Sequence, residues 1–124
     1  TRARFESDKM FITHACVSNP GLVSDVISGW IEQDREEGIV RAVRSIHSVD
    51  PRLIDILNPH LTEEQATSIR FGLSGMDELP IDEKAEEAAE FKTNIRDAQN
   101  TLNGSPSETY GSDEQPATTA PGKR

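Results

Sequence analysis

Residues 81–102, IDEKAEEAAEFKTNIRDAQNTL, decide the fold class of this chain. Apolar side chains recur in this segment at intervals of three or four residues, which places them on one face of a helix and approaches the heptad seam of packed helices. Charged side chains fill the other faces. The segment therefore predicts one long amphipathic helix with Asp82 as its N-cap. The seam consists of Ile81, Ala85, Ala88, Phe91, Ile95, Ala98 and Leu102.

The segments upstream carry helical signals of the same kind. Asn19-Pro20 joins a capping residue to a proline, and Asp50-Pro51 repeats that pair. Thr62 and Gln65 have the spacing of a capping box. Gly38 is expected to end the first of these helices. The apolar stripes between these boundaries predict helices over about residues 20–36, 38–47, 51–58 and 62–75.

The two ends of the chain differ from this middle part. Residues 1–9, TRARFESDK, are polar and predict a flexible arm. Residues 9–17, KMFITHACV, resemble a strand that extends along the helices or pairs with another molecule. Residues 103–124 contain Tyr110 as their only large apolar side chain, so we expect a disordered tail. The expected fold is all-α: a small bundle of four to five helices over residues 10–102, with an extended N-terminal segment.

Composition excludes several classes of function. The chain has 124 residues with 22 acidic and 13 basic side chains, a net charge of −9. No apolar run approaches the length of a membrane span, and no secretory signal is visible, so we expect a cytoplasmic protein. The negative charge argues against direct nucleic-acid binding. Residues 50–102 carry 5 basic and 12 acidic side chains, so most of the excess charge lies in the second half.

No segment carries a catalytic signature. His14 and Cys16 could supply a nucleophile or half a metal site, but their spacing matches no known zinc motif. An ordinary buried cysteine beside a polar histidine is the favoured interpretation. A serine elbow, a glycine-rich phosphate loop and an HExxH motif are all absent from the sequence. We therefore predict a protein that is not an enzyme, with no catalytic, cofactor-binding or metal-binding residues.

Two features of the last helix could bind a partner instead. The acidic cluster at and just before its start is either a solvated face or a docking surface for a basic protein, including the stricter case of a nucleic-acid mimic. The cluster consists of Asp77, Glu78, Asp82, Glu83, Glu86, Glu87 and Glu90. The apolar stripe of the helix either packs on the other helices or binds a partner. Aromatic side chains in the two ends could serve as further anchors. The predicted contact residues are Phe5, Phe91, Ile95, Leu102 and Tyr110, together with Glu86, Glu87 and Glu90.

Several short stretches resemble the internal scaffolding proteins of gokushovirus-like microviruses, which are small single-stranded DNA phages. The similar stretches are residues 1–9, Cys16 followed by Asn19-Pro20-Gly21-Leu22, Arg70-Phe71-Gly72-Leu73-Ser74-Gly75 with Leu79-Pro80, and residues 91–108. They cover less than half of the chain. Residues 36–68 have no counterpart, the family's Tyr-Gly-Asp-Phe stretch is missing before Phe91, and its C-terminal part is replaced by a short tail.

This resemblance implies a non-catalytic assembly factor that binds the major capsid protein during procapsid formation and then leaves. Such a protein would act in the host cytoplasm or in the immature particle. Two other classes remain open from the residues alone: an acidic inhibitor of a basic protein, and an accessory subunit of an enzyme complex. A protein partner is expected in every case, and self-association into a homo-oligomer also remains open.

Overall fold

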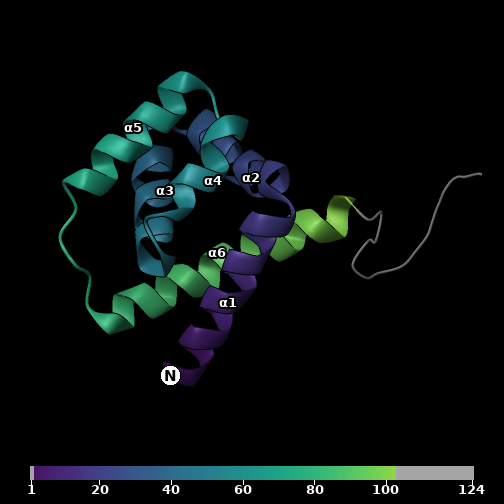
Figure 1. Ribbon diagram of the computed structural model, residues 1–124, viewed down its shortest axis with the longest axis vertical. Coiled ribbons are helices and arrows are strands. Elements are labelled where there is room, and N and C mark those ends of the chain that lie inside the picture. The colour runs from purple at the N-terminus through teal and green to yellow at the C-terminus, as the bar shows by residue number, and fades with distance from the viewer. Residues whose placement is uncertain (1, 103–124) are drawn as a thin grey trace, which may run out of the picture.

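The computed structural model describes residues 2–102, and within that range every regular element is helical (Figure 1). The all-α prediction is therefore confirmed. The tail prediction, residues 103–124 with Tyr110, lies outside the described residues. The elements are α1 (Arg2–Ser18), α2 (Pro20–Gln33), α3 (Arg35–Val49), α4 (Leu53–Leu57), the 3-10 turn η1 (Asn58–His60), α5 (Glu63–Ser74) and α6 (Ile81–Leu102).

Asn19 and Thr62 cap helices as predicted, whereas Asp50-Pro51 does not, because α4 begins at Leu53 with Arg52 as its N-cap and no side-chain capping hydrogen bond. The Asn19 side chain accepts a hydrogen bond from the Leu22 backbone N–H at 3.3 Å and starts α2. Thr62 and Gln65 form both hydrogen bonds of a capping box at the start of α5. The long helix α6 begins one residue before its expected cap. These local hydrogen bonds involve only neighbouring residues, which explains why the sequence reveals them.

The N-terminal prediction is wrong, because residues 2–18 form a helix where we expected a flexible arm and an extended strand. Phe5 is only 4% exposed, and Asp8 is 2% exposed. With Ile12, Ala15 and Cys16 they form a stripe at helical spacing that faces the core. Further apolar residues on the opposite face produced the apparent alternation. The folded domain therefore includes residues 2–9.

The boundary between α2 and α3 also differs from the prediction. Asp34 ends α2, and its side chain accepts a hydrogen bond from the Glu37 N–H at 3.2 Å to start α3. Gly38, the expected end of the helix, lies instead within the first turns of α3. A Cβ atom there would lie 2.4 Å from the Trp30 carbonyl oxygen. This glycine lets two helices approach closely and does not terminate either one.

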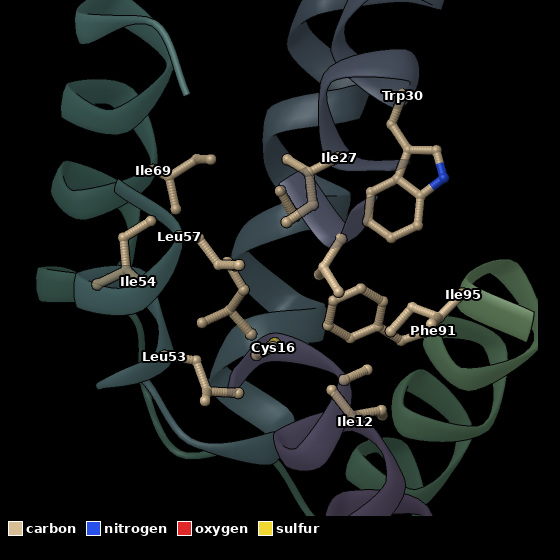
Figure 2. Close-up of a cluster of buried hydrophobic side chains, with 14 of the residues drawn as sticks. Ile12, Cys16, Ile27, Trp30, Leu53, Ile54, Leu57, Ile69, Phe91 and Ile95 are labelled. Atoms are coloured by element: carbon tan, nitrogen blue, oxygen red, sulfur yellow. The ribbon is translucent and has the colours of Figure 1, made fainter. Parts of the chain in front are cut away.

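Helix α3 occupies the centre of the molecule and packs against α2, α5 and α6. Figure 1 shows α1 crossing alongside α6 at one end, with α5 at the other end and a linker of residues 75–80 between α5 and α6. Figure 2 shows how α1, α2, α4, α5 and α6 direct side chains into one core. The labelled core residues are Ile12, Cys16, Ile27, Trp30, Leu53, Ile54, Leu57, Ile69, Phe91 and Ile95.

Candidate interaction surfaces

The apolar stripe of α6 faces inward. Phe91 and Ile95 are completely buried, and the Phe91 ring lies 5.7 Å from the Trp30 ring in a tilted arrangement (Figure 2). Both residues therefore belong to the core, which was the first of the two interpretations of this stripe. A partner could contact Phe91 and Ile95 only if the domain opened, because both side chains are buried in the folded state.

The other predicted apolar anchors fall into two groups. Phe5 is 4% exposed and lines a hollow between α1 and α6, so it also belongs to the packed interior. Leu102 ends α6, but its side chain lies outside the described residues, as does the whole of Tyr110. Those two predictions remain untested. None of the predicted apolar anchors that the structure describes lies on the surface.

The acidic cluster is partly neutralised within the molecule. Arg44 on α3 donates a hydrogen bond from Nε to the Glu87 carboxylate at 2.8 Å and contacts Glu83 at 3.3 Å. Arg41 lies 3.6 Å from the Glu90 carboxylate and stacks over the Trp30 ring, 4.3 Å from its centroid. These carboxylates therefore help to hold α6 against α3.

Glu86 differs from Glu87 and Glu90 in that it does not pair with an arginine of α3. It is exposed and lines the hollow beside Phe5 and Asp8. Because Glu87 and Glu90 pair with α3, the three residues do not form one continuous unpaired acidic surface. The hydrogen bonds that Arg44 donates, first to Glu87 and then to Glu83, also raise the pKa of its guanidinium, which stays charged.

The His14 and Cys16 side chains point in different directions. Cys16 is completely buried, and burial raises the pKa of its thiol to about 12. His14 is exposed on the outer side of α1. The thiol would be protonated at neutral pH, and a protonated thiol is a poor nucleophile. Among residues 2–102 no group of three His, Cys, Asp or Glu side chains is placed to hold a metal ion.

Phe71 is the surface residue that sequence reasoning missed. It is 81% exposed on α5, the highest value for a large apolar side chain within the described part of the chain. A signal was available, because Ala66, Ile69 and Leu73 mark the inner stripe of this helix. Phe71 is two residues from both Ile69 and Leu73, so it lies on the opposite face. We call the exposed side of α5 the Phe71 surface: Thr67, Arg70, Phe71 and Ser74.

A second exposed apolar area lies on α1. Met10 is 72% exposed and Val17 is 63% exposed, and both project from the side of α1 that faces away from the core. We call this side the α1 outer face: Met10, Thr13, His14 and Val17, all of which are exposed. Beside it a hollow of about 420 Å³ extends from Met10 and His14 to Val49 and Asp50 at the end of α3.

Comparisons with known proteins give no relative. No family model, no curated protein and no solved structure matches the chain. None of the helices in residues 2–102 has the length and apolar character needed to cross a membrane. Function must therefore be argued from the two exposed apolar areas and from the distribution of charge.

Proposed function

We propose that this chain is a non-catalytic protein–protein interaction module and that Phe71 anchors its partner. The observation that carries the proposal is the 81% exposure of this phenylalanine in a chain of which only 5% is aromatic. Burying a phenylalanine is worth about 1.5–3 kcal/mol. Aromatic anchors of this kind often dominate the binding energy of protein interfaces. In the isolated domain the Phe71 ring stays exposed to solvent, so a partner that covers it would gain this free energy.

The packing of α5 fixes the outward direction of Phe71. Gly72 lies against α3 so closely that a Cβ atom there would be 2.6 Å from a Val43 methyl group. Arg70 Nη2 donates a hydrogen bond to the Asp55 carboxylate at 3.0 Å and ties α5 to α4. With both neighbours held against the domain, Phe71 cannot turn inward without separating α5 from α3. The backbone that carries Phe71 is therefore positioned before a partner binds, which lowers the entropy cost of ordering it.

The partner that we propose to test first is a viral major capsid protein. The resemblance to microvirus internal scaffolding proteins rests partly on Arg70–Gly75, and this same stretch carries the most exposed aromatic side chain of the described residues. Scaffolding requires contacts that form and later release. A single aromatic anchor on a small acidic domain supports contacts of that kind, because a small interface favours weak, reversible binding.

The acidic-inhibitor alternative gains less support from the structure. Glu83 and Glu87 pair with Arg44, and Glu90 pairs with Arg41, so these carboxylates are already engaged within the chain. An acidic docking surface would instead present unpaired carboxylates to a basic partner. We therefore assign the partner contact to the apolar Phe71 surface.

Co-expression with the major capsid protein of a gokushovirus-like microvirus tests the proposal. Wild type should change the yield or shape of the particles and should bind the capsid protein in a pull-down. Phe71→Ala should weaken that binding by at least about ten-fold, because truncating a central aromatic anchor commonly costs 2 kcal/mol or more. Val40→Ala, at a 48% exposed apolar position on α3, is the matched control and should bind normally.

The folded state and the ionic strength give two further readouts. Phe71→Ala should melt at the wild-type temperature, since the ring makes little contact with the core. Binding through Phe71 should change little between low and high salt, whereas binding through carboxylates should weaken steeply. Unchanged binding by Phe71→Ala would refute the anchor. Co-purification with an enzyme in place of the capsid protein would refute the scaffolding assignment.

A further inference from the structure

Helix α1 is apolar on two opposite sides, and the molecule covers only one of them. Its inner side contributes Phe5, Ile12 and Cys16 to the core, as Figure 2 shows for the last two. Its outer side carries Met10 and Val17, which are seven residues apart and therefore share one face two turns apart. A surface helix of a monomer usually carries polar residues on its outer side.

The four side chains of the α1 outer face include no acidic, lysine or arginine group, although Glu6, Lys9 and Asp50 line the hollow beside them. Residues 10–24, MFITHACVSNPGLVS, contain no Asp, Glu, Lys or Arg, although 28% of the chain is charged. Helix α1 carries three basic and two acidic side chains, a net charge of +1, whereas α6 carries three basic and six acidic side chains, a net charge of −3. The α1 outer face is thus a neutral area on a molecule with a net charge of −9.

This distribution of charge indicates which kind of partner binds the α1 outer face. A basic partner would be drawn to the acidic half of the molecule by long-range attraction. A second copy of the chain carries the same −9 charge, so two copies repel each other overall, and contact is favoured on a face that brings no like charges together. The neutral apolar side of α1 is the place where two copies can approach at the lowest electrostatic cost.

We propose that two copies of this chain form a symmetric dimer through the α1 outer face. In an antiparallel pairing about a two-fold axis between Thr13 and His14, each Met10 packs against Val17 of the other copy. Thr13 then faces His14 across the axis, and no two like charges are opposed within residues 10–17. The spacing Met10, Thr13, His14, Val17 follows the i, i+3, i+4, i+7 pattern by which helices pack together.

The dimer has a consequence for the rest of the molecule. Helix α1 packs mainly on α6, whereas α5 packs on α3 and α4 (Figure 1). Pairing through the α1 outer face therefore leaves the Phe71 surface of each copy uncovered. The dimer would present two Phe71 surfaces at once, and linked sites bind a multivalent partner more tightly than either site alone.

Sedimentation equilibrium of the full chain tests the dimer. Wild type at about 100 µM should show twice the monomer mass. Met10→Asp and Val17→Asp should each raise the dissociation constant at least about ten-fold, because each would bury an unpaired charge in the interface. Phe71→Asp is the matched control, since it adds the same charge at an exposed apolar position of α5, and it should remain dimeric. Raising the salt concentration should tighten the dimer by screening its net charge.

Cross-linking tests the position of the axis. Cys16 is the only cysteine of the chain and is completely buried, so a Thr13→Cys variant adds a single accessible thiol. A short bis-maleimide should join two Thr13→Cys chains but not two Thr67→Cys chains, whose thiols would lie on α5. A monomer at every concentration, a dimer that survives Met10→Asp and Val17→Asp, or a dimer lost in Phe71→Asp would each overturn the proposal.

Discussion

At the scale of single residues, glycine sets the distance between two helices. Gly38 has no side chain, and this absence lets α3 pass directly over the end of α2, against the Trp30 carbonyl and the Ile31 Cα. In the sequence the same glycine looks like a helix terminator, because glycine commonly follows the last turn of a helix. A glycine that ends a helix and a glycine that allows close helix packing look the same in the sequence. Only the position of the neighbouring helix distinguishes the two roles.

Gly38→Ala should therefore destabilise the fold. The added Cβ would lie 2.4 Å from a backbone oxygen, which cannot move aside as a flexible side chain could. We expect a loss of about 1–3 kcal/mol, seen as a lower melting temperature by circular dichroism. Gly29→Ala is the control, because nothing lies within 4 Å of its Cβ position, and it should gain about 0.5–1 kcal/mol. Equal melting temperatures for the two variants would contradict the close approach.

Cys16 shows how burial controls chemistry. Its thiol pKa is raised to about 12 from a reference value of 9.0 by desolvation. A maleimide at pH 7.5 should leave the native protein unlabelled and should modify one thiol per chain after denaturation. Because the folded state retains the proton that the unfolded state releases near pH 9, this group lowers the unfolding free energy as pH rises from about 9 to 12. Cys16→Ala should lose that part of the pH dependence, and rapid labelling of the native protein would contradict the burial.

At the scale of elements, α1 is held to α6 by a buried ion pair as well as by apolar contact. The Asp8 carboxylate is 3% exposed and accepts a hydrogen bond from Lys92 Nζ at 3.2 Å. Lys92 also lies over the Phe11 ring, 5.2 Å from its centroid. Within α1, Asp8 also lies 3.9 Å from Arg4, but residues 1–9 alone do not predict the docking on α6, because Lys92 is 84 positions further along the chain.

Asp8→Ala should weaken the docking of α1. We expect a loss of about 1.5–3 kcal/mol in urea unfolding, since a buried hydrogen bond to a charged group is removed. Glu6→Ala on the same helix is the control, because Glu6 is 53% exposed in its pair with Lys9 and such pairs contribute little. A double-mutant cycle with Lys92→Met isolates the pair, and an interaction free energy near zero would contradict its role.

Among the structural elements, the sequence predicted best the features that depend on neighbouring residues. The Thr62 capping box and the Asn19 cap form as expected, because each involves residues within four positions. The α1 helix was missed because Met10 and Val17 add apolar residues on its outer side and hide the inner stripe. The apolar stripe of α6 is visible in the sequence. Its spacing does not show whether the stripe packs in the core or binds a partner, since both require the same spacing.

At the scale of the whole molecule, α5 is the least supported of the longer helices. It packs on α3 with a smaller contact to α4, and the linker of residues 75–80 joins it to α6. Helix α3, by contrast, packs against α2, α5 and α6. Local stability follows the number of elements that surround a segment. The Phe71 surface therefore sits on an element that can open without disrupting the central helices.

Native-state hydrogen exchange should reveal this difference. Amides in the middle of α3 should exchange only through global unfolding, whereas those of α5 should exchange through a local opening of lower free energy. Amide exchange followed by mass spectrometry at several urea concentrations measures both. Slower exchange in α5 than in α3 would contradict this ranking. Partner binding at Phe71 should raise the protection of α5 first.

The sequence by itself determined the fold class, most helix boundaries and the uneven charge, because periodicity, caps and charge counts depend on residues close together in the chain. Only the tertiary structure decided which apolar side chains are buried in the core and which remain exposed. Phe91, Ile95 and Phe5 are buried, while Phe71, Met10 and Val17 remain exposed. The physical reason is that burial depends on which other helices cover a face, and those helices come from distant parts of the chain.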